Sequence, residues 1–230
     1  ACYDFSDDLL KKAKEIADEK QLTNISFHAE NIMKYGFEER QYDVVFFHAS
    51  LHHFANIPEF LQQVVIQNLR PKGLLIINEF VGSSRLQYSK IQIKYINKAI
   101  SIIPKEYRKI FKTNIYKNNY YGSGVLRMII ADPSECVDSQ SIIPAIHEKF
   151  NVVEEKFYGN NILQSALKDI SHHFVILDST KREVLQEIFA LEDELLENHP
   201  SDSVFGNYEL KSKVFFRNPF LGSKYFISKR

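Results

Sequence analysis

A carboxylate near the start of the chain stands where a nucleotide could bind. Asp4 follows a short segment that reads as the end of a strand, and a helical pattern begins directly after Phe5. At the carboxyl end of a strand in an α/β sheet, such a carboxylate can accept hydrogen bonds from both hydroxyls of a ribose. Asp4 can instead cap the following helix together with Ser6. This residue alone leaves both interpretations open.

A second polar pair follows the next predicted strand, which covers residues 24–28. Either Glu30 or Asn31 could pair with an adenine amino group, while Ile32 or Met33 packs on the ring. The alternative is an ordinary polar turn. Two polar clusters at successive strand ends are what one nucleotide lying across the sheet requires, so the pair strengthens the nucleotide hypothesis.

Two further strand ends carry side chains that could act on protons. His53 lies just beyond the predicted strand 42–49 and, because histidine titrates near neutral pH, it is the first candidate for a general base. Its alternative is a half-buried histidine bonded to backbone. Glu79, at the end of the predicted strand 74–80, is the second candidate and could equally orient an acceptor.

The two histidine pairs predict no metal centre. His52 and His53, and likewise His172 and His173, are adjacent residues whose side chains point apart, and no cysteine or carboxylate clusters beside them in the sequence. We therefore expect no metal, and we expect His172 and His173 at a helix end or on the surface.

The elements that must position these residues alternate regularly. Ser6 is a plausible N-cap for a helix with Asp7 and Asp8 in its first turn, and Pro58 suits the start of a second helix that runs to about residue 69. The strand 42–49 is too continuously apolar for a half-exposed strand and predicts a buried parallel one. The order indicates a doubly wound α/β sheet with its ligand sites at the carboxyl ends of the strands.

After Gly82 the pattern changes to a helical insertion. We predict one domain, with a core over 1–82, a lid-like insertion over 83–131, and the rest of the sheet and helices over 132–230. The insertion is predicted to hold helices at 86–103 and 104–111 and a loop at 114–121. Beyond it we predict helices at 139–150, 162–170 and 181–198 and strands at 152–158 and 208–216.

Composition limits the partners. Lys plus Arg and Asp plus Glu number 29 each, so no basic surface favours nucleic acid, and a small-molecule partner fits better. The two cysteines form no disulfide framework or zinc pattern, and no apolar run is long enough to cross a bilayer. These features favour a cytoplasmic protein with no membrane partner.

Three segments together resemble a known superfamily. The stretch QYDVVFFHASLHHF, preceded by DFSDDLLKKAKEIA and followed by LRPKGLLIINEF, resembles the core of class I S-adenosylmethionine-dependent methyltransferases. The resemblance covers roughly residues 1–82, and later segments such as ADPSECVDSQSIIPAIHEKF are similar to a bacterial small-molecule group. It implies a Rossmann-like methyltransferase sheet, S-adenosyl-L-methionine as cofactor, and methyl transfer to an oxygen or nitrogen atom of a small-molecule or sugar-bearing metabolite.

The resemblance also implies site roles. It makes Asp4 the ribose ligand and His53 the residue that faces the transferable methyl group. Arg85 and Tyr88 are candidates for holding the acceptor, with a packed helix start as the alternative. The other implied cofactor-binding residues are Phe5 beside the adenosine, Glu30 or Asn31 at the adenine, and His48, Ala49 and Ser50 beside the methionine moiety.

The chain departs from the superfamily pattern at its start. A strand ending in a glycine-rich turn should precede Asp4, so we expect an N-terminally incomplete form of a longer chain whose activity is in doubt. The G-x-G at Gly122 and Gly124 would place its third glycine at Arg127 and is rejected. The alternatives are a catalytically silent binding or scaffold subunit and an NAD-dependent oxidoreductase, although the one Tyr-x-x-x-Lys, from Tyr225 to Lys229, lies at the extreme C-terminus.

Overall fold

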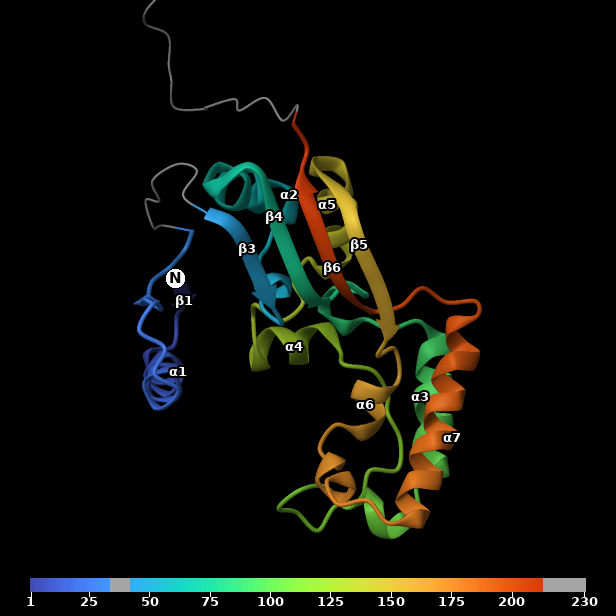
Figure 1. Ribbon diagram of the computed structural model, residues 1–230. Coiled ribbons are helices and arrows are strands. Elements are labelled where there is room, and N and C mark those ends of the chain that lie inside the picture. The colour runs from blue at the N-terminus through green and yellow to red at the C-terminus, as the bar shows by residue number, and fades with distance from the viewer. Residues whose placement is uncertain (34–41, 213–230) are drawn as a thin grey trace, which may run out of the picture.

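Six strands form two separate sheets in the computed structural model, which describes residues 1–33 and 42–212. A short parallel pair near the N-terminus is followed by a mixed four-stranded sheet with the order β3-β4-β6-β5 (Figure 1). In the larger sheet β3 and β4 are parallel, and β6 runs antiparallel to both β4 and β5. The strands are β1 (Cys2–Asp4), β2 (Phe27–Ala29), β3 (Tyr42–His48), β4 (Leu69–Phe80), β5 (Phe150–Gly159) and β6 (Ser203–Leu210).

Helices occupy most of the connections between these strands. The longest is α7 (Ser179–Leu196), and α2 (Ile57–Phe60) continues directly into a wider π-helical stretch, Leu61–Ile66. The others are α1 (Asp7–Glu19), α3 (Lys90–Ile102), α4 (Val125–Ala131), α5 (Ile142–Lys149) and α6 (Leu163–Leu167). Short 3-10 turns cover Leu51–His53, Ser84–Leu86, Lys105–Arg108, Ser139–Ser141 and Ser171–Phe174. Among the described residues, no helix is long and apolar enough to cross a membrane.

The N-terminal unit follows its local sequence signals. The hydroxyl oxygen of Ser6 accepts a hydrogen bond from the Leu9 N–H at 3.3 Å, so Ser6 caps α1 as predicted. Asp7 and Asp8 occupy the first turn, where the helix dipole favours negative charge. The helix connects β1 to β2 as a parallel crossover, and the predicted strand–helix–strand order is confirmed.

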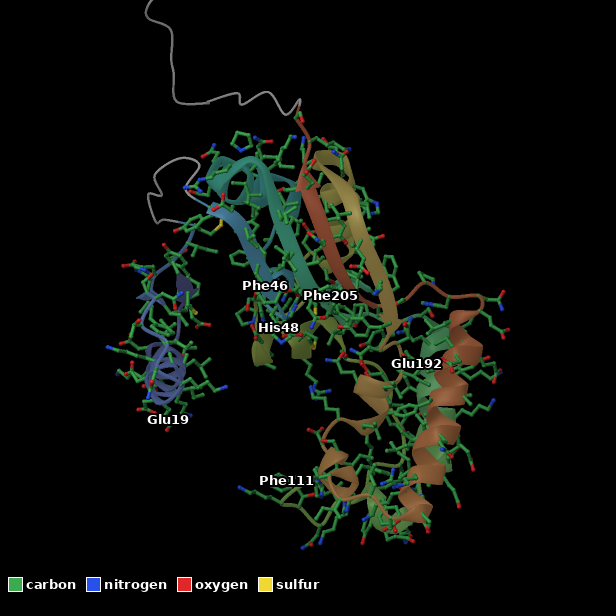
Figure 2. All side chains as sticks on the ribbon, in the orientation of Figure 1. Glu19, Phe46, His48, Phe111, Glu192 and Phe205 are labelled. Atoms are coloured by element: carbon green, nitrogen blue, oxygen red, sulfur yellow. The ribbon has the colours of Figure 1, made fainter. Side chains whose placement is uncertain are left out.

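One face of the larger sheet carries the main core. Leu75 and Ile77 of β4 and Tyr208 of β6 lie buried beneath α2, its π-helical continuation and α5. The other face is more open: Phe46 on β3 is 57% exposed and Phe205 on β6 is 40% exposed (Figure 2). The prediction of a fully buried β3 is therefore wrong, because the described helices of this core cover only one of its faces. The prediction that β3 is parallel is confirmed.

A second apolar cluster joins helices that are distant in sequence. Ile96 and Ile100 of α3 pack with residues of α6 and α7, including Ile188, and α3 and α7 lie side by side (Figure 1). The predicted insertion over 83–131 therefore shares its core with helices from the C-terminal third of the chain. The domain boundaries at 82 and 131 stay predictions.

Several predicted elements differ from the structure in extent, among them the strand predicted to begin at residue 74, which begins at Leu69. The predicted helix over 104–111 is only a 3-10 turn, Lys105–Arg108, because Lys109 then pairs with Tyr116 in an antiparallel bridge that draws the chain out of helical geometry. The last strand begins at Ser203, not near residue 208, because its first residues pair with the end of β4. Part of the predicted range 208–216 lies outside the described residues.

A buried aspartate ties the two apolar clusters together. Asp202, directly before β6, is 4% exposed and accepts a hydrogen bond from the Gln92 side chain of α3. Its backbone N–H donates to Asn161 Oδ1 at 3.0 Å, and its carbonyl accepts from the Val81 N–H at 2.7 Å. Gly82 lies so close to this carboxylate that a Cβ atom there would clash with it. Burial raises the pKa of Asp202 to about 6, against the opposing effect of Gln92.

This raised pKa predicts a pH-dependent effect of Asp202→Asn. The folded protein holds the Asp202 proton more tightly than the unfolded chain, so the contribution of this group to stability falls as pH rises from about 4 to about 6. Asparagine carries no such charge. Relative to wild type, Asp202→Asn should therefore gain about 1 kcal/mol in the free energy of unfolding between pH 5 and pH 7.5, measured by urea denaturation. Asp193→Asn, at an exposed position on α7, is the control, and an identical offset at both pH values contradicts the assignment.

Candidate functional site

The polar clusters at the ends of β1 and β2 lie next to each other. The two strands pair in parallel with Asp4 opposite Ala29, and the Glu30 N–H donates to the Asp4 carbonyl at 3.2 Å. Asp4 Oδ1 also accepts from the Ser6 N–H at 2.7 Å, so this residue does support the start of α1. Asn31 Oδ1 accepts from the Met33 N–H at 3.0 Å. The two strand ends therefore form one polar edge.

Phe5 leaves an aromatic surface beside this edge, because its side chain is 71% exposed. A cavity of about 390 Å³ lies between β1 and the edge of β3. Apolar residues from both sides line most of it, and Ser50 reaches it from the turn after β3. Of the predicted cofactor-binding residues, Ser50 lines this cavity, whereas Asp4 and Phe5 lie outside its lining.

The end of β3 is held in an uncommon backbone conformation. Ala49 has a φ of 46°, in the left-handed region that costs an alanine energy, and its N–H donates to the Asn78 carbonyl at 2.9 Å. The neighbouring His48 Nδ1 lies 3.1 Å from Asn78 Nδ2, and Figure 2 shows His48 at the lower end of its strand. Asn78 thus fixes both residues and turns the chain sharply at the strand end.

Glu79 organises the following turn. Its side chain is buried, with 1% of the residue exposed. Oε1 accepts from the backbone N–H groups of Ser50 at 2.7 Å and Leu51 at 2.8 Å, and Oε2 lies 2.7 Å from His52 Nδ1. Burial lowers the pKa of His52, but the Glu79 hydrogen bond and charge outweigh it, so the pKa lies above its usual value. This geometry favours a positioning role for Glu79, since protein groups engage both of its oxygens.

His53 lies in a polar cluster that the sequence analysis did not assemble. Its Nδ1 is 3.0 Å from Ser134 Oγ, and its Nε2 is 4.0 Å from Glu135 Oε2. Ser134 donates from both Oγ and its backbone N–H to Asp132 Oδ1, at 2.6 and 2.8 Å, and these bonds lower the pKa of Asp132. The signal for this cluster in the sequence was the pair of acidic residues within ADPSE, about 80 residues beyond His53.

Arg85 holds the loop that carries these acidic residues. Its backbone N–H donates to the Cys136 carbonyl at 2.6 Å, and its Nη1 reaches the carbonyls of Asp132 at 3.5 Å and Glu135 at 3.4 Å. Arg85 itself has a φ of 58°. The structure therefore places Arg85 against the protein backbone, as the packed alternative predicted.

Tyr88 is buried as well. It belongs to the second apolar cluster, just before α3, and burial raises the pKa of its hydroxyl. Its position matches the predicted alternative of a packed helix start. The predicted role of Arg85 and Tyr88 in holding the acceptor stays a prediction.

The remaining histidines and glycines lie elsewhere. His172 and His173 belong to a 3-10 turn, where His173 Nε2 lies 2.9 Å from the Lys109 carbonyl oxygen. Among the described residues, neither group that could hold a metal ion contains them. Gly122 and Gly124 lie in irregular chain before α4, with no strand leading into it, which agrees with rejecting the G-x-G match. Tyr225 and Lys229 lie outside the described residues.

A family model described as "Methyltransferase domain" matches residues 1–162, which is more than half of the chain. The chain belongs to the class I S-adenosylmethionine-dependent methyltransferases. The predicted superfamily and the α/β Rossmann-like fold are thereby confirmed, and the protein is a methyl-transferring enzyme by family. None of the curated proteins searched matches this chain.

Solved structures similar to this methyltransferase span most of its length. An S-adenosylmethionine-dependent methyltransferase from Mesorhizobium loti is 12% identical, with 90% of this chain and 78% of that chain covered and a TM-score of 0.46. The PH0226 protein from Pyrococcus horikoshii OT3 is 17% identical, with 91% and 70% covered and a TM-score of 0.43. The geranyl diphosphate C-methyltransferase from Streptomyces coelicolor A3(2) is 8% identical, with 91% and 60% covered and a TM-score of 0.48.

The buried carboxylate of the methyltransferase gives a direct stability prediction. Glu79→Ala would leave the N–H groups of Ser50 and Leu51 and the ring of His52 without their acceptor, at a cost of about 3–5 kcal/mol in the free energy of unfolding. Glu79→Gln keeps one oxygen for the backbone and should cost less than half as much. Urea denaturation measures both.

The matched control for this prediction is Glu183→Ala, at an exposed position on α7. It should change the free energy of unfolding by less than about 0.5 kcal/mol. If the free energy of unfolding of Glu79→Ala lies within about 1 kcal/mol of the wild-type value, the carboxylate does not organise the turn.

Proposed function

We propose that this chain binds S-adenosyl-L-methionine across the carboxyl ends of β1, β2 and β3 and directs its methyl group to an oxygen or nitrogen atom of a small-molecule or sugar-bearing metabolite. The observation that supports this most directly is the single polar edge formed by Asp4 with Glu30 and Asn31. One adenosine requires polar groups at adjacent strand ends. The family match supports methyl transfer itself.

The residues of this edge fit the adenosine half of the donor. Asp4 is exposed and accepts from the Ser6 N–H through Oδ1, so its carboxylate is oriented before any ligand arrives. We assign the ribose hydroxyls to Asp4, the adenine amino group to Glu30 or Asn31, and one ring face to Phe5. A side chain fixed in advance loses less conformational entropy on binding.

The turn after β3 is assigned to the methionine moiety. Ser50 lines the cavity, and Asn78 and Glu79 of β4 fix His48, Ala49 and Ser50 through hydrogen bonds. Backbone strain at Ala49 persists because these contacts over-determine it. In this proposal the strain holds the turn in the shape that the donor needs.

Methyl transfer requires this chain mainly to align the donor with the acceptor. The bound donor supplies a methyl group on a sulfonium, and the acceptor atom forms a bond to that carbon as the carbon–sulfur bond breaks. Positioning and exclusion of water supply most of the rate enhancement for such an in-line displacement. We assign His53 to the acceptor side of the turn, and Glu79, which accepts from the Leu51 N–H, to holding that turn in place.

A small acceptor in the cytoplasm agrees with the balanced charge of the chain, which has 29 basic and 29 acidic residues. The short helix α4 adds apolar surface close to the acidic loop, because Leu126 and Ile130 are largely exposed. We expect neither a nucleic acid nor a membrane as partner.

Calorimetric titration tests this proposal on the protein expressed from its complete gene. S-adenosylmethionine and its demethylated product S-adenosylhomocysteine should both bind. Asp4→Asn should lower both affinities at least tenfold, because the amide carries no charge to accept from two ribose hydroxyls. The amide oxygen can still accept from the Ser6 N–H, so the start of α1 should persist.

The control is Asp18→Asn, at an exposed position near the other end of α1, which should bind like wild type. If the wild-type protein binds neither S-adenosylmethionine nor S-adenosylhomocysteine, the proposal is wrong and the alternative of a catalytically silent subunit is favoured. Tight binding of NADH instead would identify an oxidoreductase.

A further inference from the structure

Tertiary packing gathers three metal-ligating side chains beside the turn after β3. His53, Asp132 and Glu135 each offer one ligand atom, all within 4.8 Å of one another, and all three residues are half-buried. We expected no metal because no carboxylate clusters beside the histidines in the sequence. That premise is wrong in the folded chain, where the loop after α4 brings two carboxylates to His53.

The hydrogen bonds around His53 indicate which ring nitrogen is available. The Ser134 hydroxyl donates its one proton to Asp132 Oδ1, so His53 Nδ1–H must be the donor toward Ser134 Oγ. In the neutral ring, Nε2 then carries the lone pair. This nitrogen lies 4.0 Å from Glu135 Oε2, so two acceptor atoms approach each other. A cation between them satisfies both, and the bond at Nδ1 is the usual support of a metal-binding histidine.

The loop that carries the two carboxylates is anchored independently of them. Arg85 reaches the carbonyls of Asp132 and Glu135, and its own N–H holds the Cys136 carbonyl. Ligand atoms around one metal with bonds of about 2.1 Å lie roughly 3.0–3.5 Å apart. The present spacing therefore needs only a small inward movement of the carboxylates.

The donor set selects the kind of cation. A second possible group, His52 with Glu135 and Cys136, shares Glu135 but is a poorer site. Glu79 engages His52 Nδ1, and the Cys136 thiol donates its hydrogen to Glu135 Oε1 at 3.2 Å, so both groups already have protein partners. Two carboxylates and one imidazole suit Mn²⁺ better than a soft, thiolate-seeking metal.

We propose that His53, Asp132 and Glu135 bind one divalent cation of the Mn²⁺ class, whose open positions receive an oxygen of the methyl acceptor. The role of this cation rests on the proposed function, since it names the acceptor as a hydroxyl compound. The binding of the cation does not rest on the proposed function, because its three ligands belong to the loop after α4 and the turn after β3.

The proposed step balances without any other reactant. A cation lowers the pKa of a hydroxyl that it coordinates, so the acceptor loses its proton to solvent. The freed oxygen lone pair forms the bond to the methyl carbon, the carbon–sulfur bond breaks, and sulfur leaves as a neutral thioether. His53 is then a ligand of the cation and takes no proton.

Electron paramagnetic resonance of Mn²⁺ tests the site without any assay of activity. Free Mn²⁺ gives a sharp six-line signal that is lost on binding, so titration of the protein from its complete gene yields stoichiometry and affinity. Wild type should bind one Mn²⁺, and Glu135→Gln and Asp132→Asn should each weaken binding at least tenfold. Glu187→Gln, at an exposed position on α7, is the matched control and should bind like wild type.

Thermal denaturation without metal shows whether each variant is folded, and His53→Gln is a further ligand variant that should lose affinity. Absence of saturable Mn²⁺ binding in wild type, or equal binding by folded Glu135→Gln, would overturn the proposal. Mn²⁺ binding is measured without nucleoside, so its failure is distinguishable from failure of the calorimetric test of donor binding.

Discussion

The buried carboxylate of Glu79 is the contact on which the site region depends. It sits at the end of β4 and accepts from the first residues after β3, joining two parallel strands where their backbone pairing ends. A buried charge is tolerated only when its hydrogen-bonding capacity is filled, and three groups at 2.7–2.8 Å do this for Glu79. The same three bonds fix the direction in which the chain leaves β3, and so the position of His53.

The predicted cofactor-binding residues lie at the strand ends of two separate sheets. Asp4 ends β1 and Glu30 and Asn31 directly follow β2, and these two short strands pair only with each other among the described residues. His48 and Ala49 lie on the larger sheet, where Asn78 holds them. In the proposed function, the smaller unit supplies the polar groups for the nucleoside and the larger one supplies the strained turn for the reacting end of the donor.

The loop after α4 contributes a third group of residues to the site region. Arg85 binds this loop through backbone carbonyls, which leaves the side chains of Ser134 and Glu135 to face His53 and that of Asp132 to accept from Ser134. An arginine expected to hold an acceptor thus holds the loop that faces His53. Removing the contacts of Arg85 with this loop would disturb the site through the loop. Arg85 is in this sense a positioning residue.

The sequence by itself determined the features that arise from neighbouring residues. The Ser6 cap, the strand–helix–strand order at the start of the chain and the polar residues at the strand ends follow from local patterns, and the family follows from the resemblance of three segments. Only the tertiary structure decided the partners of Glu79, the open face of β3 and the meeting of His53 with Asp132 and Glu135. Those contacts join segments 27 to about 80 residues apart. Periodicity and capping report one element at a time, whereas such contacts depend on how separate elements pack.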